Sequence, residues 1–339
     1  MKRRLLDLIA CPVCAGDLEL RAGEEEIERG ELTCAGCGAR YPIERGIPRL
    51  LPPELAAPDR EIQRAFGWQW QHFDEIHPET EAQLLDWLQP LRPDDFRDKV
   101  VLDAGCGSGR NSHFALEWGA REVVAMDLSL AVEAAQRRLG DRPNVHVVQG
   151  DILNPPFRRA GGFGPFDLIF SVGVLDHMPQ PRAGFDSLVG LLGPGGGIAA
   201  WVYGWEGNGF VRRVVDPVRS VTTRMPPPLL RSLSWPLGLA LHGVSRGVYA
   251  PLGERPAGRR LPLRDYLLWI APFTLRNKEN IVFDQLVSPT VHYLRREEVE
   301  DWVRGDGLER GAVSHRHGNS WRVQASRAAS AVPTGGPAG

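Results

Sequence analysis

The chain has 339 residues, of which 42% are hydrophobic and 24% charged, and its formal net charge is −2 at pH 7. This composition is typical of a globular protein with room for one large domain and one small one, and it offers no apolar run near the roughly 20 residues of a membrane-spanning helix. The near-neutral charge argues against a protein whose main task is to hold bare nucleic acid, and we expect no DNA partner.

Four of the five cysteines lie in the first fifty residues, in two pairs with the same spacing. Cys11 and Cys14 form one Cys-x-x-Cys pair, Cys34 and Cys37 form another, and 19 residues separate the two pairs. Two such pairs favour a closed, structural zinc site over disulfides, because the apolar stretch before Cys11 is too short for an export signal. We therefore predict a cytoplasmic protein with a zinc ribbon at residues 1–50.

The ribbon resembles a known family through two flanking segments. Residues 5–12 read LLDLIACP and residues 41–48 read YPIERGIP, as in the small zinc ribbons that activate RNA and protein methyltransferases. The resemblance implies a stabilising or substrate-facing module that is fused here to its catalytic domain.

An aromatic segment follows a proline-rich linker, which we place at residues 51–60. Within residues 61–98, which we predict to be helical, aromatic side chains recur at near-helical spacing together with glutamine and histidine. A helix packed on a sheet is one interpretation, and a lid that lines an acceptor pocket is the one we favour. Its candidate acceptor-binding residues are Trp68, Trp70 and Phe73.

The centre of the chain is a glycine turn after a buried strand that begins at Lys99. Asp103 precedes Gly105, Gly107 and Gly109, and a helical segment follows. The spacing G-x-G-x-G differs from the dinucleotide fingerprint G-x-G-x-x-G. It resembles motif I of the class I S-adenosylmethionine-dependent methyltransferases, and the resemblance implies that these four residues hold the amino-acid part of that cofactor.

Two further strands end in acids. Residues 122–127 close on Asp127, and residues 145–152 contain Asp151 followed by Ile152. One such acid alone would be a helix cap or a turn residue, but three in succession favour cofactor binding. The resemblance implies that Asp127 binds the ribose hydroxyls and that Asp151 and Ile152 contact the adenine, with Leu128 and Ser171 completing the cofactor set.

These elements predict an α/β fold. We expect a Rossmann-like class I methyltransferase sheet of seven mostly parallel strands over residues 99–327, with helices on both faces, a zinc ribbon and a helical insertion. After the fourth strand, the family often has two histidines, whereas this chain has Asp176 and His177. His177, His292 and His72 are the candidate proton acceptors, and the sequence leaves the choice among them open.

A basic insertion separates the fifth strand from the last helix. We assign it to residues 205–290, and its first part, 205–265, has ten arginines, no lysine and four acidic residues. A substrate cap for an anionic or amphipathic acceptor and a solvated surface or dimer contact both fit this composition. Asp284 lies in an F-D-x-x-S-P segment that lines the acceptor site in similar enzymes. Residues 328–339 are predicted to be disordered.

Together these features predict a methyltransferase that uses S-adenosylmethionine and structural Zn²⁺. Its expected acceptor is an oxygen or nitrogen nucleophile of a small anionic or amphipathic metabolite. A tRNA or protein acceptor is the first alternative, and a non-catalytic cofactor-binding scaffold is the second. We expect no stable membrane insertion, and the oligomeric state stays open.

Overall fold

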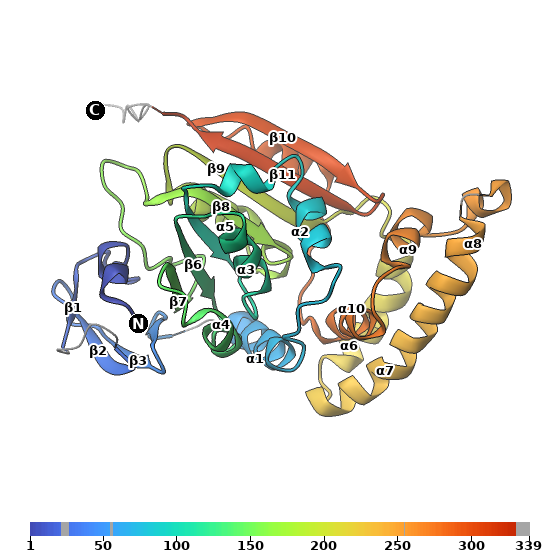
Figure 1. The fold of residues 1–339 in the computed structure, drawn as a ribbon, viewed down its shortest axis with the longest axis horizontal. Helices are drawn as coiled ribbons and strands as arrows, with labels where there is room; N and C mark the ends of the chain where they lie inside the picture. Colours follow the sequence, from blue (N-terminus) through green and yellow to red (C-terminus); the bar gives the residue numbers. More distant parts are fainter. Residues whose placement is uncertain (22–26, 55–56, 254, 330–339) are drawn as a thin grey trace.

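The computed structural model describes residues 1–21, 27–54, 57–253 and 255–329. A single sheet runs through the molecule, with helices on both of its faces and the N-terminal ribbon at one end (Figure 1). Within these ranges no helix combines the length and the apolar character that crossing a bilayer requires. Apart from Ala328 and Ala329, the tail predicted to be disordered lies outside the described residues.

The sheet has eleven strands in the order β1-β2-β3-β4-β7-β6-β5-β8-β9-β11-β10. The strands are β1 (Leu18–Leu20), β2 (Arg29–Cys34), β3 (Arg40–Glu44), β4 (Ile47–Leu50), β5 (Val100–Ala104), β6 (Glu122–Asp127), β7 (Val145–Gly150), β8 (Phe166–Val172), β9 (Leu192–Tyr203), β10 (Leu308–Arg316) and β11 (Ser320–Arg327). Neighbours from β4 to β9 are parallel, and the other pairs are antiparallel. The predicted parallel centre is present, and residues 99–327 contribute seven strands, β5 to β11, but the sheet as a whole is larger than predicted, with eleven strands, and is mixed.

The helices are α1 (Ala57–His72), α2 (Thr80–Leu88), α3 (Arg110–Glu117), α4 (Val132–Leu139), α5 (Pro181–Val189), α6 (Asp216–Thr222), α7 (Pro227–Val244), α8 (Ala250–Leu252), α9 (Arg264–Ile270), α10 (Leu275–Val287) and α11 (Arg296–Trp302). A π-helical turn, η5 (Ser245–Tyr249), continues α7. Helix α1 begins at Ala57, inside the segment for which the sequence predicted a linker.

The extra strands come from the ribbon, whose last strand joins the central sheet. Strand β4 pairs in parallel with β7, so that Arg49 lies opposite Gln149. The Arg49 guanidinium donates to the Gln149 side chain at 3.2 Å and forms a buried ion pair with Glu133 of α4. This pairing joins residues 100 positions apart, and local sequence patterns carry no sign of it.

Alternate residues of the central strands face opposite layers of the core, as the pleat of a β-strand requires. Val100 and Leu102 of β5 face a cluster with α5, α11 and the ribbon. Val101 faces a cluster with α2 and α3, and Val145 of β7 packs with α4. The parallel strands are thus buried on both faces, which explains their continuous runs of apolar residues.

A helical cap follows β9 and contains α6 to α10. Figure 1 shows α7 along the margin of the molecule, on the side away from the ribbon. Helix α7 packs closely on α10. At their contact, a Cβ atom at Gly238 would lie only 2.9 Å from the Cα atom of Glu279, so the position needs glycine. Leu230, Phe283 and Leu286 of the cap form a cluster with Phe73, and the segment around α1 thereby anchors the cap to the main domain.

Candidate active site

The glycine turn connects β5 to α3 with three left-handed backbone conformations. Gly105, Gly107 and Gly109 have φ angles of +91°, +53° and +75°. A Cβ atom at Gly105 would lie 2.3 Å from a methyl group of Val174, and one at Gly109 would lie 2.8 Å from Leu139. Both positions therefore need glycine for conformation and for space.

Asp103 lies beneath this turn and not on the cavity above it. Its side chain accepts a hydrogen bond from Ser112 Oγ at 2.6 Å, and the residue is 1% exposed. Burial raises the pKa of Asp103 to about 7. In this structure the residue supports the turn and the start of α3 from below.

Asp127, at the end of β6, faces the cavity. One carboxylate oxygen accepts from the Gly107 backbone N–H at 2.9 Å, and the other accepts from the Ser129 N–H at 2.8 Å and its hydroxyl at 2.7 Å. Burial raises the pKa of Asp127. A carboxylate has about four lone-pair positions, so one acceptor position is left for a ligand hydroxyl.

Asp151 and Ile152 line the same cavity beyond Asp127, together with Leu128. The Asp151 carboxylate accepts from the Leu153 N–H at 2.9 Å and from Asn154 at 2.7 Å, which fixes its orientation. Ser171 differs from these residues. It is fully buried, and its hydroxyl donates to the Ala104 carbonyl at 2.8 Å, which ties β8 to β5.

Helix α1 covers the cofactor end of the cavity. A Cβ atom at Gly107 would lie 3.2 Å from the Trp70 ring, and the Arg110 guanidinium lies 4.6 Å from the centre of that ring. Trp70 lines the cavity. Trp68 and Phe73, its two predicted companions, instead pack against Phe283 at 5.2 Å between ring centres.

Asp284, from α10, lines the cavity on the side of the cap. Its carboxylate accepts a hydrogen bond at 3.1 Å from Gln69 of α1, and the same amide donates to Asn280 at 3.0 Å. The lid helix and the cap are therefore joined by a buried polar contact at the cavity wall.

The three candidate histidines lie in different surroundings. His177 lines the cavity, 4.9 Å from the Phe66 ring, and its Nδ1 lies 2.8 Å from the Thr290 carbonyl oxygen. His292 is not among the lining residues, and its Nε2 is buried without a partner in the described chain. His72 stacks on Trp68 at the surface, 3.9 Å between ring centres. Of the three histidines, the structure brings only His177 to the cavity.

The far end of the cavity is a tryptophan box, which we define as Arg316 with Trp87, Trp201 and Trp269. The guanidinium lies 5.8 to 5.9 Å from the centres of the three rings. All four residues line a cavity of about 490 Å³ that also contains the glycine turn. No acceptor in the described residues bonds to the three indole Nε1 atoms, although all are buried.

Asp86 of α2 positions Arg316 in the tryptophan box. Its carboxylate accepts from Arg316, from Arg322 at 2.7 Å and from His317 at 3.2 Å. Burial opposes the ionisation of Asp86, but the bonds from His317 and Arg316 outweigh it and hold its pKa below the usual value. Two guanidinium groups share one carboxylate, which leaves an excess of positive charge beside the cavity.

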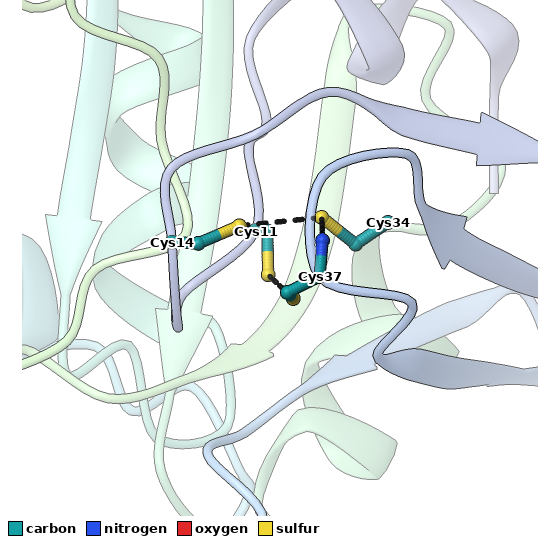
Figure 2. A group of neighbouring side chains, drawn as sticks. All are labelled: Cys11, Cys14, Cys34 and Cys37. Carbon is teal, nitrogen blue, oxygen red and sulfur yellow. Dashed lines mark hydrogen bonds between the residues drawn. The ribbon is translucent and has the colours of Figure 1, made fainter.

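The ribbon places its four cysteines together, as Figure 2 shows. All four sulfur atoms lie within 4.8 Å of one another, with 3.4 Å between Cys14 and Cys34 and 3.7 Å between Cys11 and Cys37. A zinc ion with Zn–S bonds of about 2.3 Å needs sulfur atoms about 3.8 Å apart. None of the chain's five cysteines, all of which are described, forms a disulfide.

Two family models match the chain. The model described as a methyltransferase domain matches residues 101–196, and the model of Trm112p-like proteins matches residues 2–46. The chain carries a class I methyltransferase domain and a Trm112p-like ribbon. The glycine turn, Asp127 and Asp151 all lie within the methyltransferase match, and the four cysteines lie within the Trm112p-like match.

Individual relatives cover parts of the chain. An uncharacterised Synechococcus protein, syc1184_c, is 28% identical over 61% of this chain and 46% of its own length. A tRNA U34 carboxymethyltransferase of Vibrio cholerae is 34% identical over 32% of this chain and 34% of its own length. A solved DhpI–SAH complex is 14% identical with a TM-score of 0.47, over 81% of this chain and 99% of the other. The chain thus spans less than half the length of these two curated relatives.

The residues of the methyltransferase domain fit S-adenosylmethionine. The backbone of the glycine turn lines the cavity, Asp127 keeps one acceptor position for a ribose hydroxyl, and Asp151 and Ile152 lie further along the cavity. The Trm112p-like ribbon likewise fits zinc, because four thiols at tetrahedral spacing leave no ligand position open.

Several residues of the site escaped the sequence analysis. Arg110 follows the glycine turn directly and lines the cavity, and its position inside the motif was an available signal. Arg316, Trp87 and Trp269 come from three segments more than 45 residues apart and carry no motif. They meet only because β11 pairs with β9 and because α9 of the cap packs near these strands.

Proposed function

We propose that the chain transfers a methyl group from S-adenosylmethionine to an oxygen or nitrogen atom of a small, planar acceptor that carries an anionic group. One observation carries this proposal. The cofactor turn and the tryptophan box line one continuous cavity, which α1 and the cap cover. An acceptor that reaches Arg316 from the methyl donor must therefore fit inside the protein.

At the cofactor end, the bound cofactor supplies an electrophilic methyl group. Asp127 and Asp151 hold its nucleoside part, and the backbone of the glycine turn holds its amino-acid part. Trp70 and Phe66 cover the site from α1 and exclude water. Catalysis then depends mainly on the alignment of the two reactants inside a closed cavity.

At the acceptor end, Arg316 offers a planar fork for a carboxylate between indole rings. The three indole rings form apolar walls beside this guanidinium. Planar apolar walls with a positive charge at one end suit an aromatic or conjugated acid better than a flexible sugar.

His177 is the residue that we assign to proton removal. A carbonyl oxygen only accepts, so the Nδ1 atom must carry the hydrogen that bonds to Thr290. The neutral ring then keeps the lone pair on Nε2. An Nε2 lone pair in the wall of the cavity suits a general base for a hydroxyl or ammonium acceptor.

The test follows the methyl group. Purified chain is incubated with methyl-labelled S-adenosylmethionine and a metabolite extract, half of which has been treated with ribonuclease, and the label is partitioned between small molecules and polymers. We expect label in an acidic small molecule, with no effect of ribonuclease. Label in ribonuclease-sensitive material would overturn the proposal. Cofactor binding without transfer to any fraction would support the scaffold alternative.

Transfer to tRNA is the second candidate, and the relatives favour it. The Vibrio cholerae relative is named a tRNA U34 carboxymethyltransferase, and the ribbon is Trm112p-like. In this case a nucleotide would have to enter the cavity from between α1 and the cap. Binding of tRNA that weakens steeply with salt, together with ribonuclease-sensitive label, would establish it.

A further inference from the structure

The cap exposes an unusual amount of apolar surface. Fourteen large hydrophobic side chains of the described chain are strongly exposed, and twelve of them lie between Trp205 and Val248. Ten of these form what we call the cap face, and all are 40 to 58% exposed: Val214, Val218, Val221, Leu229, Leu233, Trp235, Leu237, Leu239, Val244 and Val248. Soluble surfaces scatter such residues singly along the chain, whereas their concentration in one segment marks an interaction site.

Helix α7 buries few large side chains. Its buried positions are Leu230, Ser234 and Gly238, and Ser245 of η5 is fully buried, with its hydroxyl 2.8 Å from Lys278 Nζ. Its outer surface carries leucine and tryptophan, and residues 232–245 contain no acid, lysine or arginine. A helix with more large apolar side chains on its exposed surface than on its buried side is suited to an apolar environment on the outside.

The charges around the cap face have one sign. From Phe210 to Val248 there are six arginines and a single acid, Asp216, which pairs with the buried Arg219 at 2.8 Å. Arg213, Arg224 and Arg246 are exposed. An apolar surface edged by exposed arginines matches a partner that is apolar within and negative at its edge.

We propose that the cap face rests on the surface of a bilayer that contains anionic phospholipids. The leucine and valine side chains enter the boundary of the acyl chains, and the three exposed arginines lie among the phosphates. The helices lie along the surface and do not cross it, which agrees with the absence of a spanning helix in the described residues.

A second copy of the chain fits the charges less well. A two-fold dimer would use the same face on both molecules, so that arginines would meet arginines without acidic partners. The cavity also supports a lipid neighbour, because Leu237 is 51% exposed and at the same time lines the cavity. The cavity wall is thus continuous with the cap face.

The test is flotation of the full chain with vesicles. One set contains phosphatidylcholine with a third of phosphatidylglycerol, and the other contains phosphatidylcholine alone. We expect binding to the first set and roughly hundredfold weaker binding to the second. Leu229→Asp with Leu233→Asp should reduce binding at least about tenfold. Arg213→Gln, Arg224→Gln and Arg246→Gln together should remove the preference for anionic vesicles, by about five-fold for each arginine.

Leu130→Asp is the matched control, because Leu130 is 49% exposed but lies before α4, away from the cap face. Its binding to vesicles should equal that of the unchanged chain. Circular dichroism and S-adenosylmethionine binding verify that each variant is folded. Failure of the unchanged chain to float with anionic vesicles would overturn the proposal. So would a dimer in light scattering that Leu229→Asp with Leu233→Asp dissociates, since a second copy would then cover the face.

Discussion

The imidazole of His177 donates its Nδ1 hydrogen to the carbonyl oxygen of Thr290 across 2.8 Å. This bond selects the tautomer that leaves the lone pair on Nε2, which lies 3.9 Å from Oδ2 of the buried Asp176. Thr290 follows α10, so the end of the cap fixes the His177 ring on the η3 turn (Leu175–His177). The cap and this turn are therefore coupled through one side chain.

Replacement of His177 tests this role. His177→Gln should lower kcat by about 10² to 10⁴ and leave the dissociation constant of S-adenosylmethionine nearly unchanged, because the residue acts on the acceptor proton. Steady-state kinetics and calorimetry measure the two quantities. His72→Gln is the control, since His72 lies at the surface. Equal losses in both variants would contradict the assignment.

The two buried acids near the glycine turn should differ in cofactor binding. Asp127→Asn should weaken S-adenosylmethionine binding by about tenfold or more, because a hydrogen bond to a charged group contributes roughly 1.5 to 3 kcal/mol. Asp103→Asn should weaken it less, because Asp103 lies beneath the turn. Titration calorimetry compares them, and the reverse order would mean that Asp103 contacts the cofactor.

Asp103 should make stability depend on pH. Its folded pKa of about 7 exceeds the ordinary aspartate pKa of 3.8, so the folded state keeps a proton that the unfolded chain has released, and stability falls as pH rises between these values. Asp103→Asn removes this dependence. From pH 5.5 to 8 the variant should gain about 2 kcal/mol over the unchanged chain in urea unfolding. If the free energies of unfolding of the variant and of the unchanged chain had the same pH dependence, the raised pKa of Asp103 would be contradicted.

Arg316 and Arg322 form a matched pair. Both donate to Asp86, but only Arg316 lines the cavity. With the acceptor isolated by the labelling experiment, Arg316→Gln should raise its KM by about tenfold or more, while Arg322→Gln should leave KM close to the original value. Asp86 keeps one guanidinium partner in either variant, so both should fold. Equal KM values for the two variants would exclude Arg316 from acceptor binding.

Zinc should be required for the stability of the whole chain. Metal analysis should find about one zinc ion per chain, and Cys14→Ser should lose it and lower the melting temperature of the methyltransferase domain as well, because β4 belongs to the common sheet. Cys106→Ala is the control, since Cys106 lies in the glycine turn. Full zinc content in Cys14→Ser would contradict the site.

The sequence predicted the elements whose signals are local. Strand β6 has the expected bounds, residues 122–127, and a helix follows the glycine turn as expected. The turn could be predicted because only glycine adopts its left-handed angles without strain, and the four thiols because their spacing is itself the signal.

The rest depends on contacts between distant segments. Strand β4 has only four residues, and nothing in them specifies β7 as a partner. The tryptophan box requires α2, α9 and the β10–β11 hairpin to meet. Trp68 and Trp70 are tryptophans of one helix. Trp70 faces the cavity and Trp68 packs in the core, and the sequence does not distinguish these two directions.

The parallel pairing of β4 with β7 has a consequence for truncation. Without residues 1–50, β7 would become a bare edge strand, and Val147 and Val148 beside its open hydrogen-bonding groups would invite pairing with other chains. A catalytic fragment that begins at α1 should therefore aggregate, even though it contains every residue of the cavity. The ribbon thus covers the edge strand β7 and prevents self-association of the sheet. A separate activator subunit could cover this edge only while it is bound.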